Sequence, residues 1–396
     1  MSNNQLSKYK KAIASYLKVD DARVFLFWKG RVGLYAILKA LGVREDDEVI
    51  IPAFTCVVVP NAIIYLGAKP VYVDIESSTY NIDIAQVEKA ITSKTKVIIA
   101  QNTFGLSPNI DTLLALGQKY GIEVIEDCTH GMGGFYKNKA NGTLLKASFF
   151  STQWNKPFST GIGGIAYIND ASLAKKVQEI EANAEVPSLK DNITLSTLIW
   201  VRKNLITPQT YWLAVNTYRW LSEKNIITGS SQGDELDRPI MPKGFLKGLS
   251  TAQARVGTKE IIHLDKYVTH QRKIAQEYDI FFAKLGVHIQ KIDADYVHSY
   301  LKYPLLVKDR KGFIQRANEQ KIELGEWFNS PIHPIEKDHQ LWQYTWGSNP
   351  IAEKLSQHII NLPTGINIDN TYLTKIKAFI LSEKDNLIIL PIFLKG

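Results

Sequence analysis

The chain has 396 residues, 45% of them hydrophobic and 22% charged, a globular composition that excludes general disorder. At roughly 150 residues per domain, this length predicts two or three domains. The net charge of +8 comes from 47 basic and 39 acidic residues, which are interleaved along the sequence without a long basic run. This pattern indicates a solvated surface with a local anion site, and it argues against a nucleic-acid partner.

The two cysteines, Cys56 and Cys128, cannot form a disulfide framework and are typical of a reducing compartment. The N-terminal sequence MSNNQ lacks the basic and apolar regions of a signal peptide. The most apolar stretch, residues 49–68, is long enough to cross a bilayer, but it contains Pro52 and Pro60. We therefore expect a strand, a turn and a helix start there, no transmembrane span, and a cytoplasmic location.

In chain order, the first 170 residues alternate short β-branched runs with helical patterns, which is typical of parallel βαβ units. The helical patterns include residues 34–41, which end at Gly42, and residues 110–120, which end at Gly121. We expect an α/β fold whose large domain has a mostly parallel seven-stranded sheet with helices on both faces. Ligands would lie beyond the carboxyl ends of the strands. The predicted strands are Val24–Phe27, Glu48–Ile51, Pro70–Asp74, Lys96–Gln101, Glu123–Glu126, Ala147–Phe150 and Gly164–Ile168.

An aromatic helical insertion is predicted near residues 190–222. Its simplest interpretation is a helix pair that packs on the large domain or on a second subunit. Contact with a membrane surface is the alternative, because basic residues accompany the aromatics. Residues 230–235 form a polar break, so we predict a large domain over residues 1–240 and a smaller C-terminal α/β domain over 241–396. That domain would contain one long helix over 250–285 and a last helix over 373–381.

Two predicted strand ends carry side chains suited to chemistry. The strand at 123–126 leads to Asp127 and His130, and the strand at 147–150 leads to a polar loop with Lys156. Taken alone, a strand-end aspartate usually caps a turn and a loop lysine usually faces solvent. A third feature is the glycine-bearing helix start at residues 29–33, whose backbone N–H groups can bind phosphate. A phosphate cradle, a carboxylate and a lysine are together the parts that hold pyridoxal 5′-phosphate.

Several motifs, in the same order, resemble those of the DegT/DnrJ/StrS family of pyridoxal-phosphate-dependent sugar aminotransferases. Residues 46–55 (DDEVIIPAFT) resemble the family's GDEVIVPSFT, residues 66–75 (LGAKPVYVDI) resemble LGAKPVFVDI, and residues 127–130 (DCTH) resemble DAAH or DAAQ. Lys156 stands five residues before Gly161, as the family's Schiff-base lysine stands before GEGG. The resemblance covers most of the chain and implies the fold of aspartate aminotransferase, fold type I.

The resemblance implies a role for each matching residue. Lys156 would form the internal aldimine with pyridoxal phosphate and then move a proton, while the cofactor alternates with pyridoxamine phosphate during turnover. Asp127 would keep the pyridine nitrogen protonated. His130 would flank the ring, with a purely structural histidine as the alternative. The other expected cofactor contacts are Ser151, Gly30, Arg31, Val32 and, at the position that usually stacks an aromatic ring, Cys56.

The chain also departs from the family's pattern. Cys56 cannot stack as an aromatic side chain does. Arg31 replaces the usual threonine, and we expect its guanidinium to contact a phosphate or an acidic substrate group. Lys247 stands near the arginine of the family's NYR, which reaches a phosphate in the neighbouring subunit. His333 resembles a histidine near the family's sugar pocket, so we predict Lys247 and His333 as substrate contacts; no metal site is predicted.

The function that the resemblance implies is amino transfer, with L-glutamate as donor and a nucleotide-linked keto sugar as acceptor, at the interface of a homodimer. One alternative is a sugar dehydratase that uses pyridoxamine phosphate, but such relatives carry histidine where Lys156 stands. Another is a non-catalytic regulator that binds the cofactor or a sugar nucleotide. A general amino-acid aminotransferase would usually need an arginine for the α-carboxylate, which the sequence alone does not place.

Overall fold

The computed structural model describes residues 2–205, 217, 233–287, 290 and 292–389. A seven-stranded sheet forms its centre, in the order β1-β10-β9-β6-β5-β2-β4. All neighbours from β4 to β9 are parallel, and β10 alone runs antiparallel to its neighbours β1 and β9. All seven predicted strands are therefore confirmed, and so is the mostly parallel sheet. The strands are β1 Val24–Phe27, β2 Glu48–Pro52, β4 Lys69–Val73, β5 Thr95–Gln101, β6 Glu123–Asp127, β9 Ala147–Ser151 and β10 Gly164–Ile168.

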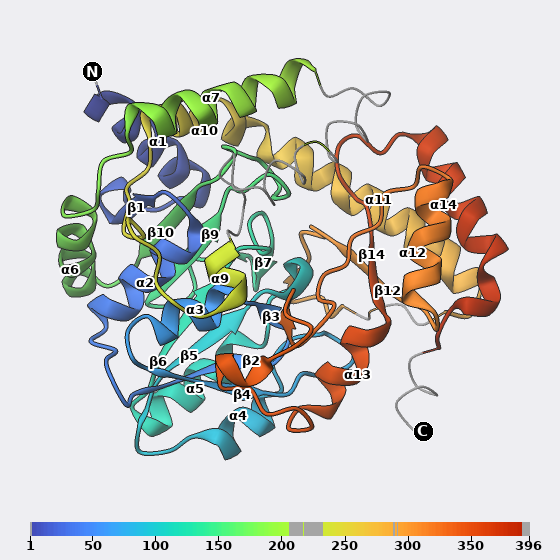
Figure 1. The fold of residues 1–396 in the computed structure, drawn as a ribbon, viewed down its shortest axis with the longest axis horizontal. Helices are drawn as coiled ribbons and strands as arrows, with labels where there is room; N and C mark the ends of the chain where they lie inside the picture. Colours follow the sequence, from blue (N-terminus) through green and yellow to red (C-terminus); the bar gives the residue numbers. More distant parts are fainter. Residues whose placement is uncertain (1, 206–216, 218–232, 288–289, 291, 390–396) are drawn as a thin grey trace.

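Helices cover both faces of this sheet (Figure 1). The alternation of side chains along β2 explains the arrangement: Val49 and Ile51 face one layer, and Ile50 faces the other. The first layer contains α2, α3 and α6, and the second contains α4 and α5. The five helices are α2 Gly30–Ala40, α3 Val58–Ile64, α4 Ile84–Ala90, α5 Ile110–Tyr120 and α6 Ala171–Ala182.

The chain begins with a helix that the sequence analysis did not predict, α1 (Ser2–Leu17). Its buried residues Tyr9 and Ile13 join a core cluster with residues of β1, β10 and α10 (Thr251–Glu260). The N-terminal helix is thus tied to the edge of the central sheet by apolar packing and to a helix far along the chain.

The long helix predicted over 250–285 is interrupted. Ser250 caps α10 through a capping box with Gln253, and a 3₁₀ turn over Ile261–His263 separates α10 from α11 (Leu264–Lys284). The prediction of a single helix was wrong because the apolar spacing continues through the 3₁₀ turn and does not mark it.

The C-terminal region has its own core, formed by α11, α12, α14 and the antiparallel pair β12–β14. Short strands connect the two regions: β3 pairs with β13 in parallel, and β7 pairs with β11. These elements are β3 Thr55–Cys56, β7 Phe135–Tyr136, β8 Lys139–Ala140, β11 Tyr296–Val297, β12 Tyr303–Leu306, β13 Ile332–His333, β14 Ile359–Leu362, α12 Arg310–Glu319, α13 Pro350–His358 and α14 Asn370–Ser382. The predicted domain boundary at 240/241 stays a prediction.

Two further expectations concern apolar segments. Residues 49–68 form β2, β3 and α3, and none of the helices in the described residues is long and apolar enough to cross a membrane. The predicted aromatic insertion begins with α7 (Leu189–Asn204), on which Trp200 is 57% exposed. Tyr211, Trp212, Tyr218 and Trp220 lie outside the described residues. A short helix, α9 (Gly233–Asp237), follows them.

Candidate active site

Asp127 ends β6 at the carboxyl edge of the parallel sheet and is 2% exposed. Its carboxylate accepts a hydrogen bond of 2.9 Å from the backbone N–H of Thr129. Burial raises the pKa of Asp127, while hydrogen bonds from Thr129 and the charge of Lys156 oppose that shift. The result is a buried acid at a strand end, close enough to Lys156 to interact with its charge.

Lys156 lies in the loop between β9 and β10, where its backbone N–H donates to the Gln153 carbonyl at 3.0 Å. Its Nζ is 4.4 Å from the ring centroid of Trp327. Among the described residues, no carboxylate oxygen lies within 4.0 Å of this amine. Burial lowers the pKa of Lys156 to about 7, so a large fraction of the amine is neutral at physiological pH. A neutral amine is the form that can act as a nucleophile or a base.

The N-terminus of α2 provides an anion cradle beside this lysine. Lys29 precedes the helix without a side-chain cap, so the N–H groups of Gly30 and Arg31 have no partner within the helix. A Cβ atom on Gly30 would lie 3.1 Å from the Phe150 carbonyl oxygen and 3.1 Å from the Cβ of Ser151. Glycine therefore lets the helix start approach the end of β9, which places the predicted residues Gly30 and Ser151 side by side. Val32, buried in the same first turn, donates its N–H to the Lys29 carbonyl.

The guanidinium of Arg31 forms an ion pair within the chain. Its Nη1 bonds the carboxylate of Glu235 at 2.5 Å, and both side chains are buried. Lys29 Nζ lies 3.9 Å from the same carboxylate, and burial lowers the pKa of Lys29 to about 8. In the structure, Arg31 therefore meets a protein carboxylate at the position where we expected a phosphate or a substrate acid.

His130 lies near Lys156 and contacts the same indole, that of Trp327. Its Nδ1 accepts the Phe104 N–H at 3.3 Å, which leaves the proton of the neutral ring on Nε2. Burial holds the pKa of His130 well below its usual value, and the charge of Lys156 adds to that effect. Its ring stacks on the indole of Trp327, with centroids 4.8 Å apart and planes at 4°. His130 is thus neutral and faces the same indole as Lys156.

Cys56 and His333 are partners in the two-stranded pairing of β3 with β13. Burial raises the pKa of the Cys56 thiol, and the charges of Arg31 and Lys156 oppose this. The His333 ring nitrogen Nδ1 is 2.5 Å from the Asn329 side-chain oxygen, and burial lowers the pKa of His333 to about 3. The chain therefore brings both predicted residues to the edge of the Lys156 site.

Lys247 is the predicted residue that the structure does not place beside Lys156. Its Nζ forms an ion pair of 2.9 Å with Asp191 of α7 and lies 5.4 Å from the Trp28 ring centroid. Its charge also acts on Lys29, so it lies near the helix-start end of the site.

Sequence reasoning missed three residues of this region: Trp327, Lys302 and Glu235. Trp327 contacts His130 and Lys156, and Lys302 Nζ lies 5.4 Å from the same indole centroid. A possible signal for Trp327 was the aromatic pair at 327–328, six residues before His333. Nothing in the spacing of Lys302 and Glu235 indicates that they approach the site.

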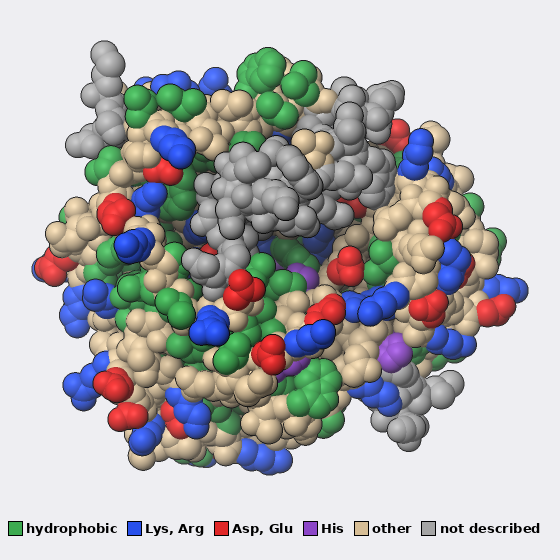
Figure 2. Space-filling model, in the orientation of Figure 1, with side chains coloured by type: hydrophobic (Ala, Val, Ile, Leu, Met, Phe, Trp, Pro, Cys, Tyr) green, Lys and Arg blue, Asp and Glu red, His purple; other side chains and the backbone are tan. Residues whose placement is uncertain are grey.

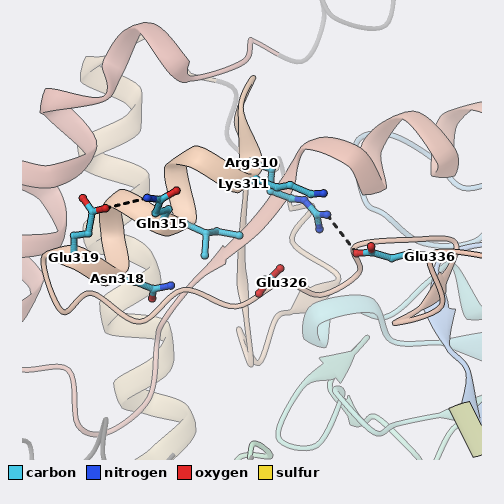
Figure 3. Close-up of a pocket in the computed structure, with 8 residues that line it drawn as sticks. Arg310, Lys311, Gln315, Asn318, Glu319, Glu326 and Glu336 are labelled. Carbon is cyan, nitrogen blue, oxygen red and sulfur yellow. Dashed lines mark hydrogen bonds and ion pairs between the residues drawn. The ribbon is translucent and has the colours of Figure 1, made fainter. Parts of the chain in front are cut away.

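Two cavities of about 390 and 380 Å³ lie in the C-terminal region, away from Lys156. Figure 3 shows the first, between the side chains of α12 and the loop residues Glu326 and Glu336. On the molecular face in Figure 2, basic and acidic side chains are interleaved, as the sequence predicted.

The residues present fit pyridoxal phosphate. The uncapped α2 N-terminus with Ser151 suits a phosphate, and buried Asp127 suits a pyridinium nitrogen. Lys156 offers an amine that has no carboxylate partner among the residues the structure describes. The fold and this site define a pyridoxal-phosphate enzyme of fold type I, with a large α/β domain and a smaller C-terminal one.

Comparisons with known proteins agree with this class of enzyme. The model of the DegT/DnrJ/EryC1/StrS aminotransferase family matches residues 1–205 and 214–380. GDP-perosamine synthase of Escherichia coli O157:H7 is 26% identical over 370 residues, 93% of this chain and 86% of that protein. UDP-2-acetamido-2-deoxy-3-oxo-D-glucuronate aminotransferase of Pseudomonas aeruginosa is 25% identical over 352 residues, 88% and 83% of the two chains.

A solved structure with a similar fold is NtdA of Bacillus subtilis with bound pyridoxamine phosphate. Its TM-score is 0.73 at 19% identity, and the match covers 96% of this chain and 77% of NtdA. The chain belongs to the DegT/DnrJ/EryC1/StrS aminotransferase family. It is an aminotransferase, and its cofactor is pyridoxal phosphate.

Proposed function

We propose that this aminotransferase moves the amino group of L-glutamate to a keto sugar that is linked to a nucleotide, with Lys156 as the lysine that carries the cofactor. The observation that supports this most is the buried amine of Lys156, with no carboxylate within 4.0 Å among the described residues and its pKa lowered to about 7. A lysine that served only structure would be paired or solvated.

In this proposal, each residue has a defined task. When bound, pyridoxal phosphate supplies an electron sink for a carbanion. Nζ of Lys156 holds the proton that leaves the substrate carbon and returns it later in the reaction. The carboxylate of Asp127 holds a proton on the ring nitrogen. N–H groups at the start of α2 and Ser151 bind the phosphate, and His130 presents its Nε2–H to the site.

The substrate class rests on the relatives. The names of the two curated relatives refer to amino sugars carried by GDP or UDP. A nucleotide-linked sugar is therefore the acceptor class that we propose, in the biosynthesis of an amino sugar or of a polysaccharide that contains one. We place the reaction in the reducing cytoplasm, which the two free cysteines support. We also propose a homodimer, in which Lys247 reaches toward the partner subunit's cofactor.

The test is the visible absorbance of the protein loaded with pyridoxal phosphate, before and after addition of L-glutamate. We expect the cofactor band to bleach and one equivalent of 2-oxoglutarate to form per site. A band that persists with L-glutamate and with other amino acids would contradict the proposal. A band that bleaches only with another amino acid would contradict the choice of donor alone.

A further inference from the structure

Lys302 is a second lysine of the candidate site, and the reaction described above does not use it. It stands directly before β12, and its backbone N–H donates to the Phe104 carbonyl at 3.5 Å. Its Nζ is 5.4 Å from the Trp327 ring centroid, against 4.4 Å for Lys156 Nζ. Two amines from distant parts of the chain therefore approach one indole.

In the part of the chain that the structure describes, Lys302 has no anionic partner in direct contact. Within the described ranges, no carboxylate oxygen lies within 4.0 Å of its Nζ, and Glu323 acts on it only through longer-range attraction. The titratable groups around Lys302 are mostly basic. The charge of Lys302 lowers the pKa values of Lys156 and His130, and His333 lowers the pKa of His130 as well. Two carboxylates act on these lysines through their charge: Asp127 on Lys156 and Glu323 on Lys302.

Such an arrangement costs stability. Burial lowers the pKa of Lys302, which shows that its ammonium form is penalised in the protein alone. A partly buried cation without an anion is retained against this penalty when a ligand supplies the missing charge. A neutral sugar hydroxyl would not compensate the charge, and the phosphate of the cofactor has its own cradle at the start of α2.

We infer that Lys302 binds a carboxylate of the substrate that reacts at Lys156. The inference rests on the proposed function and adds to it the requirement that one of the two substrates is acidic on this side of the site. Two sources carry the same chemistry: a carboxylate of the amino donor, or the carboxylate of an acidic sugar such as a uronic acid. Trp327, which both lysines approach, offers an apolar surface to the carbon skeleton of either ligand.

The experiment compares the wild type with Lys302→Met, which keeps the length of the side chain and removes its charge. Lys302→Arg restores a cation and should restore binding in part. Lys308→Met is the matched control, since Lys308 is exposed at the far end of β12 and donates to the Asp385 carbonyl. Thermal unfolding checks the fold: Lys302→Met should unfold at the same temperature as the wild type or above it, because it removes an unpaired buried charge.

Two arms distinguish the sources. In the first, the L-glutamate concentration for half-maximal bleaching of the cofactor band should rise about 10- to 100-fold in Lys302→Met, with the limiting rate nearly unchanged. In the second, calorimetric titration with UDP-glucuronate and UDP-glucose measures binding without turnover. In this arm, the wild type should bind UDP-glucuronate more tightly than UDP-glucose, and Lys302→Met should bind the two equally.

A change in the first arm alone assigns Lys302 to the donor, and a change in the second alone assigns it to an acidic sugar. The inference is overturned if Lys302→Met behaves like the Lys308→Met control in both arms. In the calorimetric arm, this includes the result that the wild type does not prefer UDP-glucuronate to UDP-glucose. Failure of the proposed function looks different: no amino acid would bleach the band even in the wild type, while the calorimetric arm would still report on Lys302.

Discussion

Asp127 and Glu126 are adjacent in β6, and their side chains have different surroundings. The carboxylate of Glu126 accepts backbone N–H bonds from Gly142, Leu144 and Leu145, so it organises the turn before β9. Asp127 accepts one backbone bond, from Thr129, and its carboxylate interacts with the charge of Lys156. We therefore propose that the two buried acids of this strand have different roles, structural for Glu126 and functional for Asp127.

This division predicts opposite effects of two isosteric changes. Asp127→Asn keeps an acceptor for Thr129, so it should lower turnover by about 100-fold or more with little change in unfolding temperature. Glu126→Gln brings an amide N–H against backbone donors and should destabilise the fold by roughly 1–3 kcal/mol. Steady-state rates and thermal unfolding of both variants measure the difference. Near-normal turnover in Asp127→Asn would remove Asp127 from the mechanism.

The lowered pKa of Lys156 predicts how cofactor loading depends on pH. In a free peptide, a lysine amine loses its proton near pH 10.4. In the protein, burial lowers this pKa to about 7, so the reactive neutral fraction rises as the pH increases through 7. We expect the initial rate of pyridoxal phosphate incorporation to rise from pH 6 to 8 and then level off. A rate that keeps rising toward pH 10 would show an ordinary, solvated amine.

At the scale of elements, the proposed phosphate site depends on the start of α2. A Cβ atom added at Gly30 would lie 3.1 Å from the end of β9, whereas a Cβ atom on Gly33, in the same helix, would find its nearest neighbour at 3.6 Å. We therefore expect Gly30→Ala to weaken pyridoxal phosphate binding about 10-fold, because the cradle must open.

Gly33→Ala is the control for this prediction. It should leave cofactor affinity unchanged and stabilise the helix by up to about 1 kcal/mol. Equilibrium titration of both proteins with pyridoxal phosphate measures the affinities. Equal affinity for the two variants would mean that the start of α2 does not hold the phosphate.

The elements that the sequence predicted best are those with strong local signals. The seven strands carry β-branched runs bounded by turns, and α5 ends at Gly121, which adopts a left-handed conformation with φ of +69°. The helix α1 was missed because its apolar residues are buried by α10, far along the chain. The 3₁₀ turn before α11 was missed because apolar spacing alone does not reveal it.

At the scale of the whole molecule, the site residues that the sequence predicted are again those with a local signal. Asp127, Lys156 and the start of α2 were predicted because each follows a recognisable strand or opens a helix. Lys302 and Trp327 reach the site from the C-terminal region, and Glu235 meets Arg31 across 204 positions of sequence. Such contacts depend on how distant segments pack, and no local pattern encodes them.

The proposed homodimer also belongs to this scale. On α7, Leu189, Ile193 and Trp200 share one face and are 77%, 57% and 57% exposed. An apolar face of this kind is typical of a surface that a second subunit covers.

We expect the protein to elute as a dimer in size-exclusion chromatography with light scattering. The double variant Ile193→Glu/Trp200→Glu should shift it toward monomer, because it places charges in an apolar contact. Lys175→Glu, at an exposed position of α6, is the control and should stay dimeric. A monomeric wild type would contradict the homodimer, and a dimeric double variant would place the interface elsewhere.

The most direct test of the central claim is borohydride reduction of the protein loaded with pyridoxal phosphate, followed by peptide mass mapping. The account predicts a covalent cofactor adduct on Lys156, and the loss of that adduct in Lys156→Ala. Lys302 and Lys29 are the informative competitors, since burial lowers the pKa values of both amines as well. An adduct on either of them in the wild type, or one that survives in Lys156→Ala, would contradict the assignment of Lys156 as the lysine that carries the cofactor.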